Sequence, residues 1–423
     1  MNTSRRWARP QPVLWVVAGQ ACLSLAGFLL LVALGRWGSP EALGLFSLGW
    51  SVCFLSLSIA DTLVYTPGAW LQTQHHHAND TDHSLAARTL AVLLVGLLPI
   101  SALIGVLQLV LPETLGRLDG SLACAVTALC LRDFARRHWI QTRRPQLSFA
   151  AEGSSALILL TGLLSLHMTL GLSATGAMWM LALSGIGPLL PAVRARHLVA
   201  LCRAFAHLGN TARACWAYGR WLLMGGLFHV GTQQALPWLA AHVGGTTMAG
   251  WWAAGMSVSN AMSPLLTALT NHHRPRFMVA QSTAGRQGLQ QAVRDSLSGY
   301  LIAPWGMCLA AWVASPIMVQ GIYGPSFDPT AHALPWLCAV VGLTAAAAPA
   351  QLALLARGQS HSNPVFHGVT LMGLGVGGLL WVSTTAPTVE GLAQAYLGAS
   401  LLGTTVLWQM YGRSWALIKT AAG

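Results

Sequence analysis

The sequence predicts an all-α polytopic membrane protein with twelve transmembrane helices in two pseudo-symmetric lobes of six. Three observations support this fold class. Only 8% of the 423 residues are charged while 54% are hydrophobic, and the mean hydropathy is +0.56. A soluble protein of this size could not cover so much apolar surface. The charged residues gather between apolar stretches long enough to cross a bilayer, and the two halves of the chain are similar to each other.

The apolar stretches define the predicted helices. A spanning helix needs about 20 mostly apolar residues, and turns such as Gly38-Ser39-Pro40 and Gly244-Gly245 separate consecutive stretches. The predicted spans are 12–34, 43–66, 89–111, 119–140, 148–170, 172–193, 221–243, 247–270, 296–318, 332–356, 365–386 and 389–411.

The basic residues set the predicted orientation. With the N-terminus in the cytoplasm, the outer segments hold only Arg36 and Arg117 of the 23 Lys and Arg residues. The others lie in cytoplasmic segments or at inner helix ends, where positive charge accumulates in membrane proteins. Both termini are therefore predicted to be cytoplasmic. The outer connections are short and leave no room for an extracellular domain.

The longest connection divides the chain into three predicted parts. Residues 194–220 carry five Arg among apolar side chains such as Phe205 and Trp216, which is typical of an amphipathic helix on the anionic cytoplasmic leaflet. We therefore predict an N-lobe at 1–193 with helices 1–6, a basic cytoplasmic linker at 194–220, and a C-lobe at 221–423 with helices 7–12.

An internal repeat supports the division into lobes. Shifting the chain by 206 residues places Leu43–Val52 over Ala249–Val258, with both Gly, one Ser and the Val identical. Because each half holds an even number of spans, both halves enter the membrane from the same side. The lobes are expected to be related by an axis along the membrane normal, with a substrate path between them.

Charged residues inside the predicted spans are candidate functional residues, because a charge at the bilayer centre costs roughly 2.5–3.5 kcal/mol on insertion scales. The fourth span carries Arg132, Asp133, Arg136 and Arg137. Arg132 and Arg136 are one turn apart on the same face, and a stripe of guanidinium groups there would bind phosphate bidentately. The alternative is that the span leaves the lipid early and these side chains snorkel to the cytoplasmic surface.

Four further polar residues are candidates. Asp61 and Glu152 lie near inner helix ends, where either could exchange a proton or form an ion pair with an arginine of the fourth span. Asp133, within the fourth span, is a candidate for the same two roles. Ion pairing is the interpretation that we favour. His229 lies well inside the seventh span, and with Gln233 a turn further on it would line a polar cavity wall that contacts substrate. A histidine in a helix is more often simply hydrogen-bonded.

The sequence gives no sign of an enzyme, a cofactor or a resident metal. It contains no GxxxxGK[ST] loop, so ATP hydrolysis is not built in. The eight Cys residues have no paired spacing that would indicate disulfides or a zinc site. His75-His76-His77 with Asp80, Asp82 and His83 looks like a metal site, but it lies in a predicted cytoplasmic loop without helical spacing. Adventitious metal affinity is the favoured interpretation there.

Three short motifs carry a resemblance to a known family. They are the outer turn Gly35-Arg36-Trp37-Gly38-Ser39-Pro40-Glu41-Ala42-Leu43-Gly44, the cytoplasmic segment from Pro275-Arg276-Phe277 to Gly285, and the outer turn Tyr323-Gly324-Pro325-Ser326-Phe327. In this order the chain resembles the polysaccharide (O-antigen type) flippases of the MOP superfamily, which are relatives of the MATE exporters and the lipid II flippases. The resemblance covers most of the chain. The chain departs from the family in its short length and in having no acidic residue in helix 1.

The resemblance implies a MOP/MATE-like transporter of the bacterial inner membrane. Such a protein moves a polyprenyl-pyrophosphate-linked oligosaccharide from the inner to the outer leaflet by alternating access, and its further partners would be the machinery of polysaccharide polymerisation and export. Two alternatives remain open. A MATE-type drug exporter shares the fold, although the missing acidic residue in helix 1 counts against a cation-coupled one. A membrane glycan polymerase or ligase would normally have a large periplasmic loop, which this sequence lacks.

Overall fold

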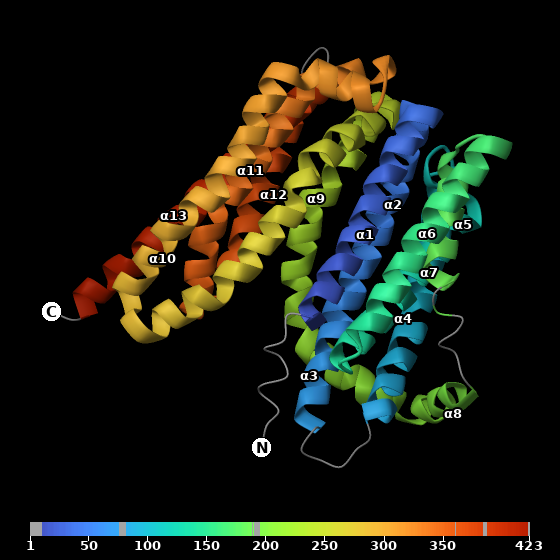
Figure 1. Cartoon of the computed structure of the whole chain (residues 1–423), viewed down its shortest axis with the longest axis horizontal. Coiled ribbons are helices and arrows are strands. Elements are labelled where there is room, and N and C mark those ends of the chain that lie inside the picture. The colour runs from blue at the N-terminus through green and yellow to red at the C-terminus, as the bar shows by residue number, and fades with distance from the viewer. Residues whose placement is uncertain are drawn as a thin grey trace. The chain divides into compact units, whose positions relative to one another are not determined.

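The computed structural model describes residues 11–75, 82–187, 189, 195–359, 361–383 and 387–421. Every regular element in these ranges is a helix (Figure 1). The chain divides into two compact units, Met1–Leu227 and Phe228–Gly423, and the division falls inside the seventh predicted span. The lobe and linker boundaries at 193 and 220 remain sequence-based predictions.

The first unit contains six long helical stretches and a short helix that precedes α9. Its elements are α1 (Gln11–Ala33), the π-helix η2 (Leu34–Gly38), α2 (Pro40–Ala60), the π-helix η3 (Asp61–Tyr65), α3 (Thr66–His75), α4 (Asp82–Val110), η4 (Leu115–Leu118), α5 (Asp119–Gln141), α6 (Pro145–Thr169), α7 (Ala174–Ile186), α8 (Ala195–Ala204) and η6 (Phe205–His207). Figure 1 shows α1, α2, α5 and α6 running alongside one another. Contacts between α1 and α6, α5 and α7, and α2 and α5 hold this unit together.

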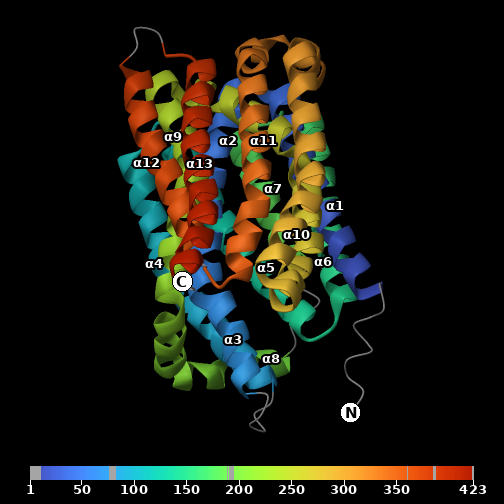
Figure 2. The ribbon, with the colours of Figure 1, turned by 90° about the vertical axis from the view of Figure 1, so that its left-hand side faces the viewer.

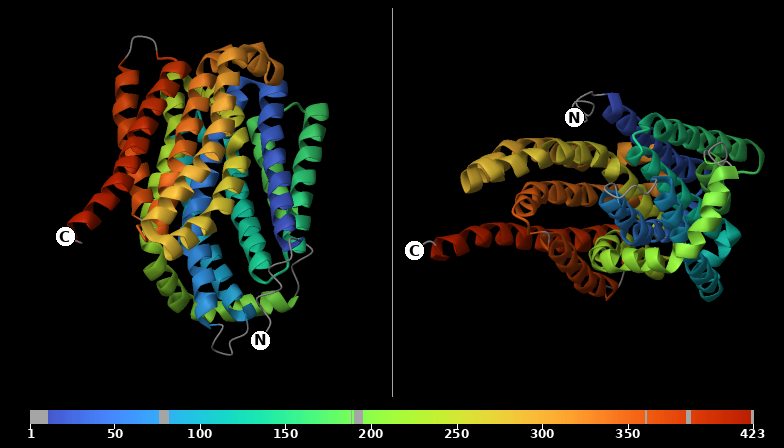
Figure 3. Two further views of the ribbon diagram at one scale, coloured as in Figure 1. Left: turned by 60° about the vertical axis from the view of Figure 1, so that its left-hand side comes forward. Right: turned by 90° about the horizontal axis from the view of Figure 1, so that it is seen from below.

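The second unit begins within α9 (Leu208–Ser259). It continues with η7 (Asn260–Met262), α10 (Ser263–Ile322), η8 (Pro325–Phe327), α11 (Asp328–Ala356), α12 (Ser362–Val382) and α13 (Val389–Ala421). Helix α11 packs against both α10 and α13, and α13 packs against α12. Figures 2 and 3 show α11, α12 and α13 side by side. The core between α9, α11, α12 and α13 is built around Trp252, Leu337 and Tyr396.

Two of the long helices are interrupted where glycine adopts a non-helical backbone. In α9, Gly244 (φ −118°) and Gly245 (φ +69°) break the helix, and in α10, Gly285 (φ +52°) does the same. The positive φ of Gly245 and Gly285 is cheap only for glycine, which explains why the chain can turn at these two residues. Each of α9 and α10 is therefore two helices in sequence.

The end of α9, η7 and the start of α10 follow one another directly and form one stretch between the two breaks. Counted in this way, the described residues give twelve helical stretches, of which α7 is short at 13 residues, and the predicted all-α fold class is confirmed. Seven helical stretches of the described residues are long and apolar enough to cross a membrane, and one of them is the run Val199–Ile322 of 124 residues. The turn predicted at Gly38-Ser39-Pro40 starts α2, where Ser39 Oγ accepts a hydrogen bond from the Ala42 amide at 3.1 Å and Pro40 occupies the first turn.

Candidate functional site

The charged residues of α5 lie in the second half of that helix. Its first half packs into the first unit through small and branched side chains such as Leu122, Ala125 and Leu129, which are fully buried. From Arg132 onward the helix is only partly buried. The buried half therefore holds the charged half at a fixed position against α2, η3 and α6.

Asp133 joins two of the three arginines. Its Oδ1 accepts from Arg136, with Nε at 2.9 Å and Nη2 at 2.7 Å, and its Oδ2 accepts from Arg137 Nε at 2.9 Å. The three residues are three and four positions apart, the spacing at which side chains meet on a helix surface. With the Asp133 side chain 19% exposed and the arginines 25% and 33% exposed, this is a partly desolvated, charge-assisted arrangement.

Arg137 is also paired across the helix interface. Its Nη1 lies 2.7 Å from Asp61 Oδ1 in the π-helix η3, and Asp61 accepts a further hydrogen bond from Thr66 Oγ1 at 3.1 Å. The Arg137 guanidinium carbon lies 5.0 Å from the centroid of the Tyr65 ring, and the Tyr65 hydroxyl donates to the Cys130 carbonyl at 2.8 Å. Insertions of π-helix occur frequently at functional sites, and this one places Asp61 and Tyr65 on either side of Arg137.

Glu152 of α6 is the most deeply buried carboxylate of the group. Its side chain is 3% exposed, and its Oε1 lies 3.8 Å from Arg136 Nε. Its Oε2 is buried without a hydrogen-bond partner among the described residues, as is the Ser148 hydroxyl one turn earlier. A Cβ added to Gly19 of α1 would clash with Oε2, so glycine is what allows α1 to pass over this carboxylate. A buried carboxylate oxygen without a hydrogen-bond donor is costly when the group is ionised.

Arg132 differs from its neighbours. It is partly buried, and in the described part of the chain no side chain forms an ion pair or a hydrogen bond with its guanidinium. We call Asp61, Arg132, Asp133, Arg136, Arg137 and Glu152 the α5 charge cluster. Its three cations and three anions cancel in formal charge. The structure places Asp61 and Glu152 beside the arginines of α5, as the favoured ion-pair interpretation expected, with Arg137 against Asp61 and Arg136 near Glu152. The binding of phosphate by these arginines stays a prediction.

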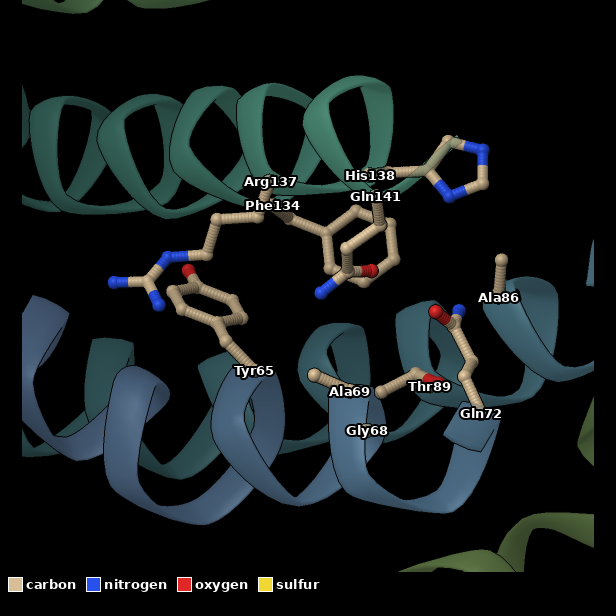
Figure 4. A pocket seen from close by; sticks show the side chains of 10 residues that line it. All are labelled: Tyr65, Gly68, Ala69, Gln72, Ala86, Thr89, Phe134, Arg137, His138 and Gln141. Carbon is tan, nitrogen blue, oxygen red and sulfur yellow. The ribbon is translucent and has the colours of Figure 1, made fainter. Parts of the chain in front are cut away.

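A small cavity lies next to the cluster. Figure 4 shows Arg137 extending over the Tyr65 ring at one end, with Phe134 and Gln141 reaching in from α5 and Gln72 and Thr89 from the opposite helices. Its volume is about 20 Å³, which accommodates a water molecule but no substrate headgroup. This cavity is therefore a candidate for bound water beside Arg137.

In the second unit the structure gives His229 a partner that the sequence did not suggest. His229 Nδ1 on α9 lies 3.1 Å from Nε2 of His367 on α12, and the rings meet edge to face with centroids 4.5 Å apart. His229 is exposed while His367 is buried. Gln233 is partly buried one turn further along α9. The histidine and aspartate loop with His75-His76-His77, Asp80, Asp82 and His83 lies outside what the structure describes: residues 76–81 are not described, nor are the side chains of His75, Asp82 and His83.

Three residues at these sites were not identified from sequence. Tyr65 and Gly19 gave no signal of their own. His367 lies within the eleventh predicted span, and a histidine in an apolar stretch was the same signal that singled out His229. The register of α9 against α12, which brings the two rings together, is not readable from either helix alone.

No family model and no curated protein matches the sequence. Solved structures do match. An inward-facing multidrug resistance MATE family transporter of the MOP superfamily aligns with a TM-score of 0.76 at 13% identity, covering 96% of each chain. A MOP superfamily transporter from Pyrococcus furiosus, described as having a binding pocket of reverse polarity, aligns at 0.62 and 12% identity over 96% of this chain and 95% of that one.

The lipid II flippase MurJ in an inward closed conformation also aligns, with a TM-score of 0.57 at 12% identity, covering 93% of this chain and 86% of that one. The chain has the fold of the MOP superfamily transporters. Identities this low establish the fold and leave the transported molecule to be argued from the site.

Proposed function

We propose that the chain is a membrane transporter that moves a polyprenyl-pyrophosphate-linked oligosaccharide across the bacterial inner membrane by alternating access, for polysaccharide export. The fold shared with MATE transporters and the lipid II flippase MurJ supports the transporter class. One observation carries the substrate class. In the described part of the chain, Arg132 has no hydrogen bond or close ion pair and feels Asp133 and Glu152 only through space, whereas the two neighbouring arginines are in direct contact with carboxylates.

The proposed role of Arg132 follows from its chemistry. A planar guanidinium can donate two parallel hydrogen bonds to one phosphate, and it stays charged in a partly buried position. The carboxylates of the cluster neutralise Arg136 and Arg137. These two residues therefore mainly fix the position of α5, and their remaining N–H groups could donate further hydrogen bonds to the pyrophosphate. Arg136 is the more available of the two, because its contact with Glu152 is long at 3.8 Å. Arg137 is held on both sides by Asp133 and Asp61.

The acidic members of the cluster are the proposed coupling residues. Glu152 Oε2 has no hydrogen-bond donor among the described side chains, and a carboxyl group in that situation is stabilised by binding a proton. Proton binding at Glu152 would remove one anion from the cluster and leave a net positive charge for the pyrophosphate. Asp61 and Asp133 remain paired with arginine in this scheme.

A drug exporter of the MATE type is the second candidate, because a MATE transporter is among the aligned structures. A lipophilic cation would need a carboxylate rather than a guanidinium as its partner. Asp61, whose side chain is 40% exposed, is the carboxylate of the cluster best placed for that role. The glycolipid transporter therefore depends on Arg132 and the drug exporter on Asp61.

Several features accompany the principal proposal. The chain is placed in the inner membrane with both termini cytoplasmic, as an N-lobe at 1–193, a linker at 194–220 and a C-lobe at 221–423. Helix α8 and the start of α9 supply the helical character expected of the linker. A polysaccharide polymerase or export complex is the expected partner, and the activity requires no enzyme chemistry or cofactor.

Binding of the purified full-length protein to a polyprenyl-pyrophosphate oligosaccharide in detergent tests the proposal. Arg132→Ala is expected to weaken binding about 10- to 100-fold, the equivalent of about 1.5–3 kcal/mol for a charge-assisted contact. Arg132→Lys should recover part of that loss, because a point charge cannot reproduce the planar fork. Arg203→Ala, which removes an exposed charge from α8, is the matched control. Equal binding by Arg132→Ala and Arg203→Ala would contradict the proposal.

A further inference from the structure

The histidine pair of the second unit has a hydrogen-bond pattern that determines where its protons lie. Thr232 Oγ1 lies 2.7 Å from the His229 carbonyl, to which it must donate, because a carbonyl only accepts. The single hydroxyl proton is then used. Toward His367 Nδ1, at 3.5 Å, Thr232 can act only as an acceptor. His367 therefore carries its proton on Nδ1.

The second ring follows from the first. A neutral imidazole has one donor and one acceptor nitrogen, so His367 Nε2 is an acceptor. His229 Nδ1, 3.1 Å away, must then be the donor. The one lone pair left free in this series of hydrogen bonds is on His229 Nε2. Every other ring nitrogen of the pair is already committed to a hydrogen bond.

We propose that the His229–His367 pair is a binding site for a single proton in the second unit, with His229 Nε2 as the atom that takes it. Addition at this nitrogen preserves both hydrogen bonds and strengthens the one to His367, because its donor becomes charged. Addition to His367 would instead place two N–H groups face to face. The pair therefore accommodates one proton and no second. The site does not depend on the identity of the transported molecule.

The exposure of the two rings agrees with this assignment. His367 is 9% exposed, packs edge to face against Phe366 and is shielded, whereas His229 is exposed. The α13 segment that faces this part of α12 lies around Gly403, and its polar side chains there are Ser400 and Thr404.

No charged group compensates the pair directly. Further titratable side chains on the surrounding elements include Tyr218, Arg220 and His242 on α9, Arg357 after α11, His361 before α12, and Glu390, Tyr396 and Tyr411 on α13. Among the described residues, the carboxylate Glu390 is engaged by Trp336 and Gln394, and the hydrogen bonds of the two rings join them to each other and to Thr232. The added proton is thus stabilised by the imidazole partner and by solvent reaching His229, and it leaves a net charge on α9.

Nitrogen-15 NMR of the histidine rings in the full-length protein, in lipid nanodiscs, tests the proposal across the pH range in which the protein stays folded. The expected result is Nδ1–H on both rings at high pH and one proton taken up by the pair, at His229 Nε2, as the pH falls. The signals are assigned with His229→Gln and His367→Gln, and His361→Gln is the control that should leave both rings unchanged. Uptake at His367 Nε2, uptake of two protons, or uptake of none would overturn the proposal.

A second variant keeps the test decisive where a histidine substitution prevents folding. Thr232→Val is nearly isosteric but removes the acceptor for His367 Nδ1–H, whereas Thr232→Ser retains it. In Thr232→Val the two tautomers are no longer fixed, and proton uptake should spread to His367 Nδ1. In Thr232→Ser uptake should remain at His229 Nε2. Identical behaviour of the two variants would show that Thr232 does not fix the tautomers of the two histidines, and would overturn the assignment of the proton to His229 Nε2.

Discussion

The paired carboxylates of the α5 charge cluster should differ in how much they stabilise the fold, and Asp133→Asn tests this most sharply. Asp133 is 19% exposed and accepts from both Arg136 and Arg137 at 2.7–2.9 Å. Removing one partner of a fully buried pair costs about 3–5 kcal/mol, largely because the other charge is left uncompensated. Partial exposure and the remaining Asp61–Arg137 pair reduce this, and we expect a loss of about 2–3 kcal/mol in unfolding free energy.

Asp61→Asn is the matched comparison within the same cluster. Its side chain is 40% exposed and pairs with Arg137 alone, which retains Asp133. For a pair this open to solvent we expect a loss of at most about 1 kcal/mol. Both values are measured by denaturant titration of the purified protein in micelles, with an unchanged size-exclusion elution profile as a check on folding. Equal losses for the two variants, or a larger loss for Asp61→Asn, would refute the argument from burial.

Three further predictions concern glycines and topology. Gly19→Ala should lower the midpoint of thermal unfolding, because the new Cβ meets the Glu152 carboxylate, whereas Gly27→Ala on the same helix meets nothing within 4 Å and should be nearly neutral; a reversed order would mean that α1 does not pass over Glu152. Gly245→Ala should destabilise the second unit by about 1 kcal/mol because of its φ of +69°, whereas Gly306→Ala in a helical, open position should not, which paired melting curves can check. A reporter fused after Gly245 should report the periplasm and one after Gly285 the cytoplasm, and the opposite pair of answers would contradict the predicted orientation.

The helical architecture was readable from the sequence because its physical causes are local. Long apolar stretches must form helices in a bilayer, where every backbone polar group has to be satisfied internally. The turn at Gly244-Gly245 was visible from the sequence because paired glycines mark turns, and the positive φ of Gly245 is cheap only for glycine.

The candidate sites were only partly readable, because their geometry depends on contacts between helices distant in sequence. Asp133 could be placed with Arg136 and Arg137 from helical spacing alone. That Asp61 could form an ion pair with the fourth span was expected from the sequence, but that its partner is Arg137 depends on how η3 packs against α5. Glu152 Oε2 is buried without a hydrogen bond where α1 passes over it at Gly19, and neither residue reveals this separately.

The His229–His367 contact illustrates the same limit. Each histidine lies in an apolar span, where a hydrogen-bonded role was the simplest interpretation of the sequence. Which partner it finds is decided by the packing of α9 beside α12, where a Cβ added to Gly231 would crowd Leu371 and one added to Gly378 would crowd Leu239. Small residues at these positions allow the two helices to approach closely enough for the rings to meet.

The most direct test of the central claim is transport by the purified full-length protein reconstituted into liposomes, with two substrates compared. One is a fluorescent polyprenyl-pyrophosphate oligosaccharide whose outer-leaflet fraction is read by a membrane-impermeant quencher, and the other is a lipophilic fluorescent cation. We predict that the wild-type protein moves the glycolipid, that Arg132→Ala abolishes this movement while Arg203→Ala preserves it, and that the cation is not transported. Transport of the cation, lost in Asp61→Asn and unaffected by Arg132→Ala, together with no movement of the glycolipid, would contradict the account.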